Sequence, residues 1–221
     1  MRNILILGGT GDIGQAIAES FAQDQVLSAG SQQCDLSCSS SVSKFVKQHN
    51  TFDVIVHCAG HNNPKTFENL STDEIDHNLQ INLLGFLPIV RNNIDHWRVT
   101  GTGRLIIISS LYGQYGRQGR LAYSISKHGL VAVTKTLAIE LAPLGVMVNA
   151  VSPGYIQTRM TVKNNTPDVI DRLVKGIPVG RLGQPREIAA LVSFLASADN
   201  TYITGQDIAV DGGYTAGGFQ Q

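Results

Sequence analysis

Short apolar runs of strand length alternate along the chain with longer segments whose apolar residues recur at helical spacing. The strand-like runs span residues 4–7, 26–28, 54–57, 105–108, 146–151 and 208–210, and the helix-like segments span 13–22, 42–48, 75–94, 122–141 and 187–196. The runs are apolar throughout rather than alternating, which is typical of strands covered on both sheet faces. This order predicts repeated β-α units and an α/β fold, a doubly wound parallel sheet with helices on both faces.

One stretch, residues 152–185, departs from this pattern because it carries four prolines and little periodicity. Long irregular segments inside a compact domain are usually binding loops, so we expect a lid over a substrate at about residues 155–178. The length of 221 residues suits one domain of ordinary size. We therefore expect residues 1–221 to form a single domain.

Composition narrows the range of partners. Charged residues make up 15% of the chain and the formal net charge is zero, so there is no basic field to attract nucleic acid or an anionic membrane. A small-molecule substrate is the better expectation. The three cysteines lack the spacing of a zinc site, and no metal is expected. Without a leader-like or membrane-spanning apolar run, a cytoplasmic protein is expected.

A glycine-rich loop follows the first strand and opens the first helix, with the sequence Gly-Gly-Thr-Gly-Asp-Ile-Gly at residues 8–14. Glycines let the backbone turn tightly and approach a pyrophosphate, whose charge the free N–H groups at a helix N-terminus bind. The strand before and the helix after favour a dinucleotide site over the alternative, a tight turn with no ligand.

A tyrosine and a lysine, Tyr123 and Lys127, stand four positions apart in the helix-like segment 122–141. This spacing puts both on one helix face, where an ammonium group near the phenol favours its ionised form. Ser110 ends the strand-like run before them, and its hydroxyl could hold a carbonyl while the tyrosine passes a proton. Taken alone, such a pair is more often an ordinary exposed helix pair.

Together these motifs make the chain resemble the short-chain dehydrogenase/reductase family, and among its members the 3-oxoacyl-(acyl-carrier-protein) reductases. The resemblance implies a Rossmann-like fold and an NAD(P)-dependent enzyme. The family's Thr-Gly-x-x-x-Gly-Ile-Gly falls on residues 7–14, with Leu7 in place of Thr and Asp12 in place of Gly. Asp12 would repel a phosphate unless its side chain points away or caps the helix.

The family's catalytic tetrad falls on Asn82, Ser110, Tyr123 and Lys127. The resemblance implies that Tyr123 donates a proton to the carbonyl oxygen while Ser110 stabilises that oxygen. It further implies that Lys127 binds the nicotinamide ribose and lowers the pKa of Tyr123 toward working pH. Asn82 is implied to lie at a local break of its helix, where a water links the lysine to solvent.

The same resemblance assigns the cofactor contacts. It places a nicotinamide contact after the Pro-Gly at the end of the run 146–151. It also matches the family's Asn-Asn-Ala-Gly to residues 57–60, where His57 and Cys58 replace the two amides. His57 could equally be a packed histidine with no contact to the cofactor. The expected cofactor-binding residues are Gly8, Thr10, Gly11, Asp12, Ile13, Gly14, Asp35, Leu36, Ala59, Gly60, Tyr123, Lys127, Pro153, Gly154, Ile156 and Thr158.

Cofactor choice depends on a region that is shortened in this chain. The stretch from Val26 to Asp35 has no room for the helix that normally joins the family's second and third strands, although Asp35-Leu36 resembles the dipeptide that closes the third. No acidic residue directly follows the run at 26–28 to bind a ribose 2'-hydroxyl, and Ser28 and Ser31 could serve a 2'-phosphate. This favours NADP over NAD.

The predicted function is the interconversion of a ketone and a secondary alcohol, as a reductase of a small or acyl-linked carbonyl. Two alternatives stay open at this point: a non-catalytic cofactor-binding regulatory or scaffold protein, and a sugar or polyol dehydrogenase or epimerase of the same fold. Tyr112, Gln114, Tyr115, Arg117 and Gln118 fit either a polar substrate pocket or a subunit rim. The helix at 122–141 carries more apolar residues than one sheet face needs, which favours a homodimer or homotetramer.

Overall fold

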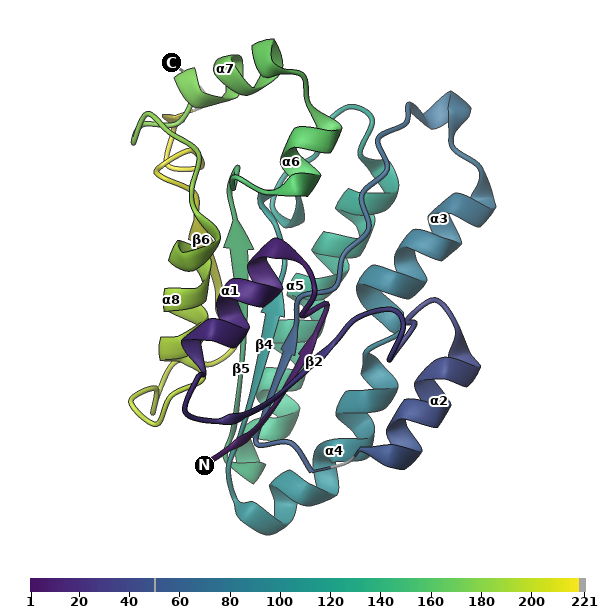
Figure 1. The fold of residues 1–221 in the computed structure, drawn as a ribbon, viewed down its shortest axis with the longest axis vertical. Coiled ribbons are helices and arrows are strands. Elements are labelled where there is room, and N and C mark those ends of the chain that lie inside the picture. The colour runs from purple at the N-terminus through teal and green to yellow at the C-terminus, as the bar shows by residue number, and fades with distance from the viewer. Residues whose placement is uncertain (50, 219–221) are drawn as a thin grey trace.

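Six parallel strands form one sheet in the computed structural model, which describes residues 1–49 and 51–218. The spatial order is β2-β1-β3-β4-β5-β6. The strands are β1 Asn3–Leu7, β2 Gln25–Ala29, β3 Val54–His57, β4 Gly103–Ile108, β5 Val146–Pro153 and β6 Asp207–Val210 (Figure 1). Each strand-like run in the sequence is therefore a strand, and the prediction of a parallel sheet is confirmed.

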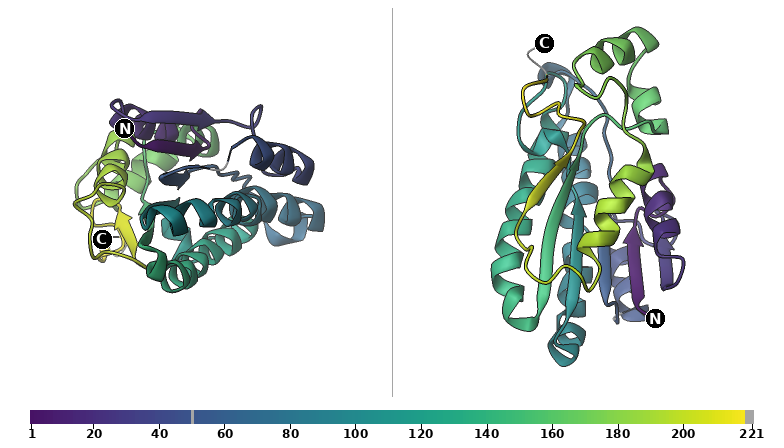
Figure 2. Two further views of the ribbon diagram at one scale, coloured as in Figure 1. Left: turned by 90° about the horizontal axis from the view of Figure 1, so that it is seen from below. Right: turned by 90° about the vertical axis from the view of Figure 1, so that its left-hand side faces the viewer.

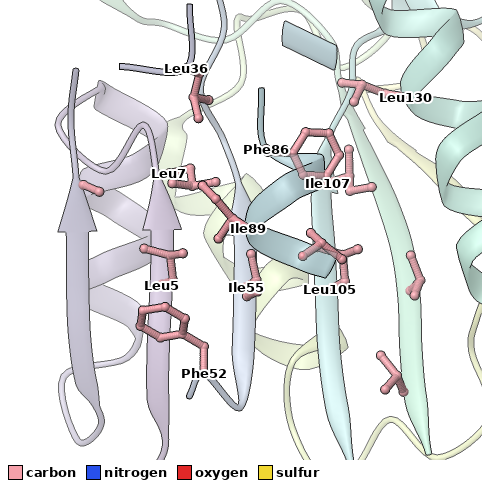
Figure 3. Close-up of a cluster of buried hydrophobic side chains, with 14 of the residues drawn as sticks. Leu5, Leu7, Leu36, Phe52, Ile55, Phe86, Ile89, Leu105, Ile107 and Leu130 are labelled. Carbon is pink, nitrogen blue, oxygen red and sulfur yellow. The ribbon is translucent and has the colours of Figure 1, made fainter. Parts of the chain in front are cut away.

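Two layers of helices cover the sheet (Figure 2). Apolar residues of α1 Asp12–Ser20 and α8 Pro185–Leu195 pack on one face, against Ile4, Ile6 and Ile106. Those of α2 Ser39–Gln48, α4 Leu87–Thr100 and α5 Leu121–Leu141 pack on the other, around Leu5 and Ile107 (Figure 3). Neighbouring residues of one strand point to opposite faces, so a strand buried on both sides must be apolar at every position.

The sheet ends at β2, because the chain passes from β2 to α2 through residues 30–38 with neither a helix nor a strand. The expected shortening is therefore confirmed, and Asp35-Leu36, which resembles the family's third-strand end, lies outside any strand. A parallel crossover needs a dozen or more residues, and this connection is too short to supply one. Leu36 and Cys34 instead bury their side chains in the core beside α2.

The expected helix at 75–94 is divided in the structure. It consists of α3 Thr72–Leu79, a π-helical turn Gln80–Leu84, and α4, which has Pro88 in its first turn. Proline has no N–H to continue the preceding ladder. Gly85 also lies against the Leu36 backbone so closely that a Cβ atom would come within 2.3 Å of the Leu36 oxygen. The break is thus fixed by the packing of α4 on the shortened loop.

The lid segment is more regular than the sequence predicts. It contains α6 Arg159–Asn164 and α7 Pro167–Lys175, which lie beyond the carboxyl ends of the strands (Figure 1). Three short 3-10 helices, Phe67–Asn69, Leu111–Gly113 and Ala142–Leu144, complete the elements. Within residues 1–49 and 51–218, no helix is both long and apolar enough to cross a membrane.

Candidate active site

The loop between β1 and α1 is shaped by backbone contacts that only glycine allows. Gly8 has φ +83°, and a Cβ atom on Gly14 would come within 2.3 Å of the Gly8 carbonyl oxygen. Gly11 caps α1 without any side-chain hydrogen bond to the first turn. The N–H groups of that turn are therefore available to an anion, at the end of the helix that carries positive partial charge.

Asp12, the charged departure from the family's loop, is neutralised by the lid. Its carboxylate accepts hydrogen bonds from the backbone N–H and from Nε of Arg159, at 2.6 and 2.7 Å. Arg159 Nη2 also donates to the Thr10 carbonyl at 3.2 Å. The ion pair joins the first turn of α1 to the first turn of α6, so the carboxylate charge is compensated beside the phosphate loop.

A cleft of about 590 Å³ runs from this loop to Tyr123 along the carboxyl ends of the strands. Every residue expected to bind the cofactor lines it: Gly8, Thr10, Gly11, Asp12, Ile13, Gly14, Asp35, Leu36, Ala59, Gly60, Tyr123, Lys127, Pro153, Gly154, Ile156 and Thr158. Ser110 lines it as well, whereas Asn82 lies behind the wall that Ile81 contributes. Ligands of open parallel sheets bind at this edge. The glycines have no side chains, so a ligand can come close to the backbone of the cleft wall. The cleft therefore fits a dinucleotide.

Ser110, Tyr123 and Lys127 meet at the middle of this edge. Lys127 Nζ donates to the Ile108 carbonyl at 2.8 Å and lies 5.4 Å from the centroid of the Tyr123 ring. Ser110 follows β4, and its Oγ accepts a hydrogen bond from the Tyr112 N–H at 3.2 Å. Gly60 borders Lys127, since a Cβ atom there would lie 3.8 Å from Nζ. The sequence spacing therefore brings proton donor, hydroxyl and ammonium groups together.

The electrostatics of this group differ from the expectation. Burial raises the pKa of Tyr123 to about 12, and the hydrogen bond with Ser110 opposes that rise without reversing it. Burial lowers the pKa of Lys127 to about 8. The expectation that Lys127 lowers the pKa of Tyr123 toward neutrality is therefore wrong for this structure, because desolvation penalises the charged form of both groups. Tyr123 stays protonated at working pH, the state that a proton donor requires.

Asn82 lies fully buried at the π-helical turn, so the expected helix break is present. Its Oδ1 accepts from the His61 N–H at 2.7 Å. Its Nδ2 donates to the His61 carbonyl, Asn78 Oδ1 and Ser126 Oγ, each at 3.0 Å. Ser126 directly precedes Lys127 in α5. Asn82 thus ties the loop after β3 to the helix that carries the lysine.

His57 and Cys58, which replace two amides of the family pattern, have separate environments. His57 stacks on Phe86 at 4.1 Å between ring centroids, and its Nε2 donates to the Asn82 carbonyl at 2.8 Å. Burial lowers the pKa of His57 to about 3, so the ring is neutral. Cys58 lines the cleft, and burial raises the pKa of its thiol to about 12. His57 is therefore a packed histidine that supports the helix break.

A cluster of tyrosines and arginine lies beside Tyr123. Arg117 Nη1 donates to the hydroxyl groups of Tyr112 and Tyr155 at 2.6 and 3.2 Å. The Tyr112 ring meets the Tyr123 ring edge-on at 6.1 Å between centroids. Tyr155 carried no role in the sequence, although its position two residues after Pro153 could have indicated one. Of the polar residues left ambiguous, Arg117 and Tyr112 thus belong to the neighbourhood of the active site.

The other three polar residues, which fitted either a substrate pocket or a subunit rim, lie in different places. Tyr115 packs edge-on against Tyr112 at 5.6 Å between ring centroids and so belongs to the same cluster. Gln114 is exposed and donates to Asp207 Oδ2 at 3.0 Å, and Gln118 lines a separate surface groove of about 830 Å³. Neither glutamine lines the cleft that contains Tyr123.

A doubly wound sheet with a glycine-rich phosphate loop and a Ser-Tyr-Lys group at the strand ends defines an NAD(P)-dependent oxidoreductase. A family model described as Enoyl-(Acyl carrier protein) reductase matches residues 12–215. The chain belongs to the short-chain dehydrogenase/reductase family, and it is an enzyme that interconverts a ketone and a secondary alcohol with NAD(P).

Three known proteins illustrate this kinship. The chain is 36% identical over 214 residues to the 3-oxoacyl-(acyl-carrier-protein) reductase FabG of Aquifex aeolicus, covering 95% of this chain and 86% of that one. It is 39% identical over 172 residues to the acetoacetyl-CoA reductase of Allochromatium vinosum, covering 78% and 70%. A putative NAD(P)-dependent gluconate 5-dehydrogenase from Beutenbergia cavernae, solved with bound NADP, superposes with a TM-score of 0.92 at 29% identity, covering 97% of both chains.

Proposed function

We propose that the protein reduces a ketone with NADPH, with Tyr123 as the proton donor. The observation that carries this proposal is the convergence of Ser110, Tyr123 and Lys127 at one end of the cleft, with the phosphate loop at the other. A nicotinamide bound in this cleft supplies hydride to the carbonyl carbon. Negative charge then develops on the carbonyl oxygen, and the residues of the chain must meet that charge.

Each residue of the group has a role that its surroundings support. Tyr123, protonated because burial raises its pKa to about 12, gives its phenolic proton to the oxygen. Ser110 donates a hydrogen bond to the same oxygen and holds the substrate in place. Lys127 is fixed by the Ile108 carbonyl, and its remaining N–H donors would bind the nicotinamide ribose. Asn82 positions Lys127 through Ser126 and the loop after β3.

NADP is the proposed cofactor. Gly30 and Ser31, which follow β2, line the cleft without an acidic residue beside them in the sequence. Asp35 is the nearest carboxylate of that loop in the sequence, and its Oδ1 accepts hydrogen bonds from the backbone and hydroxyl of Ser37 at 2.9 and 2.7 Å. The carboxylate is thus already engaged within its own turn. Titration with NADPH and NADH, followed by nicotinamide fluorescence, tests this choice, and tighter binding of NADH would refute it.

The proposed substrate is a small or acyl-linked ketone. The named activities of the relatives from Aquifex aeolicus and Allochromatium vinosum support acyl thioesters as the first compounds to assay. The lid supports a substrate with some apolar surface, because Met160 lines the cleft. We further propose that the protein is cytoplasmic. We also propose a homodimer or homotetramer, because α5 leaves Ile125 and Ile139 exposed. Light scattering of the purified protein would give its mass in solution.

Replacement of Tyr123 by Phe tests the proposed catalytic role. Tyr123→Phe removes the transferable proton and keeps the ring, so we expect turnover to fall by about 10²–10⁴-fold while NADPH affinity stays within about twofold, because a phenol proton adds little to cofactor binding. Tyr202→Phe is the matched control, since Tyr202 is almost fully exposed and away from the cleft. Retained turnover in Tyr123→Phe would rule out this role.

A further inference from the structure

Arg120 carries a buried positive charge that no neighbouring carboxylate in the described part of the chain balances. It precedes α5 as its N-cap and keeps 8% of its surface exposed. Its Nη1 donates to Asn62 Oδ1 at 2.9 Å, and in the described part of the chain no carboxylate forms an ion pair with it. Burying a guanidinium without a counter-ion is costly, and burial lowers the pKa of Arg120 accordingly.

The surroundings of Arg120 add to this excess of positive charge. Arg117 is near enough for its charge to lower the pKa of Arg120 further, and it too has no acidic partner among the described residues. Arg117 is instead held by the hydroxyl groups of Tyr112 and Tyr155. The N-terminus of α5 contributes a positive partial charge of its own. All three features favour an anion at this place.

Arg120 also faces the reacting group. Arg120 directly precedes α5, and Tyr123 and Lys127 follow it within the helix, three and seven residues later. The charge of Arg120 reaches the Tyr123 phenol and opposes the rise in its pKa. An anion bound by Arg120 would therefore lie about one helical turn from the proton donor.

The neighbours of Arg120 place it on the side where a substrate must bind. Asn62 lies two residues after Gly60, which borders Lys127 Nζ. The Asn62 carbonyl accepts a hydrogen bond from Asn164 Nδ2 of the lid helix α6, at 3.3 Å. The Arg120–Asn62 pair thus lies between the start of α5, which carries the proton donor, and the end of the lid helix α6.

We propose that the ketone substrate carries a carboxylate a few bonds from its carbonyl group, and that Arg120, oriented by Asn62, binds this carboxylate. The proposal rests on the proposed function and narrows its substrate class to keto acids or acyl chains with a carboxylate near the ketone. A guanidinium binds a carboxylate through short charge-assisted hydrogen bonds, which would supply the missing counter-ion. The phosphate of a carrier arm lies too many bonds from the ketone to reach Arg120.

Matched acids and esters test this proposal. Pyruvate, acetoacetate and 4-oxopentanoate place a carboxylate progressively further from the ketone, and the methyl ester of each is the neutral counterpart. With NADPH, we expect at least one acid to have a lower KM than its ester. Arg120→Gln keeps a side-chain donor for Asn62 but loses the charge, so it should raise that acid's KM by about 10- to 100-fold and change the ester's KM by less than about twofold.

Two further variants keep the test decisive. Arg120→Lys retains the charge and should recover part of the affinity for the acid, which a purely structural role of Arg120 would not explain. Arg104→Gln is the control, because Arg104 lies at the start of β4 and donates to the Gly103 and Asn200 carbonyls, far from Tyr123 along the strand. This control should leave both substrates unchanged.

The outcomes separate this proposal from the proposed function. Equal KM values for acids and esters, or equal losses in Arg120→Gln, overturn the carboxylate site. Reduction of a neutral acetoacetyl thioester that depends on Tyr123, with no acid preferred over its ester, keeps the ketoreductase and overturns the carboxylate site. Where no ketone is reduced, the proposed function fails, and quenching of bound NADPH fluorescence by the acids decides the site. Quenching lost in Arg120→Gln supports it, and no quenching overturns it.

Discussion

Replacement of Asn82 by Ala should separate the positioning of the active site from the general cost of losing a buried amide. Asn82 Oδ1 accepts one hydrogen bond, and the two hydrogens of Nδ2 are shared among three acceptors. Each buried hydrogen bond contributes about 1 kcal/mol net, so Asn82→Ala should lower the free energy of unfolding by about 3–4 kcal/mol. A domain of this size is stable by about 5–15 kcal/mol, so the variant should still fold.

Asn93 provides the matched control. It is equally buried, it lies in α4, and its side chain bonds to the Phe52 N–H and carbonyl, both at 2.8 Å, away from the cleft. Asn93→Ala loses two hydrogen bonds and should cost about 2 kcal/mol. Urea unfolding gives both values, and the slopes of the two transitions should agree because the exposed surface is the same.

Activity then distinguishes the two asparagines. Asn82 holds His61, next to Gly60, and Ser126, next to Lys127. Without these bonds the lysine and the loop can shift, and a shift of about 1 Å costs roughly 10²-fold in rate. We expect kcat to fall by about 10-fold or more in Asn82→Ala and by less than about twofold in Asn93→Ala. An unchanged kcat in Asn82→Ala would contradict the assigned positioning role, whatever its stability loss.

Three other expectations follow from contacts in the cleft. Arg159→Ala leaves the Asp12 carboxylate uncompensated and should weaken NADPH binding about fivefold, or about 1 kcal/mol, in a fluorescence titration, whereas the Asp12→Ala, Arg159→Ala double variant should recover it. The pKa of Lys127 is about 8, so the lysine is charged below that pH. NADPH affinity should therefore decline as pH rises through 8, and Lys127→Ala should show no such decline. A flat profile in the wild-type protein would argue against the ribose contact. Gly14→Ala should lower the free energy of unfolding by about 3 kcal/mol, because its Cβ would come within 2.3 Å of the Gly8 carbonyl oxygen. Gly11→Ala should be tolerated, because its Cβ would lie 3.5 Å from the same oxygen.

Local sequence patterns predicted the sheet and most of the cleft, because both depend on features that the sequence displays directly. Strands inside a sheet covered on both faces are mainly apolar, and each of the six mainly apolar runs is a strand. The carboxyl ends of parallel strands share one edge, so residues after β1, β3, β4 and β5 had to gather there. The resemblance to a family added the roles of the site residues, which their spacing alone did not determine.

Features that depend on tertiary contacts could not be predicted from the sequence. The ion pair between Asp12 and Arg159 joins residues 147 positions apart, and neither residue signals the other. The π-helical turn depends on Gly85 meeting the Leu36 backbone, a contact that exists only once the shortened loop has folded. The pKa of Tyr123 depends on how deeply the phenol is buried, whereas the sequence revealed only that a lysine stands four positions away.

The shortened edge affects one end of the cofactor cleft and spares the other. The lost crossover lies beyond β2, and the elements that carry Ser110, Tyr123 and Lys127 follow β4 and precede β5, at the far side of the sheet order. The Ser-Tyr-Lys group therefore lies apart from the shortened edge. The end of the cleft beside β2 is lined by Gly30, Ser31 and Asp35 of one short loop. In the proposed binding mode, discrimination between NADP and NAD depends on this loop, which makes it the part of the fold where cofactor choice can change without disturbing the chemistry.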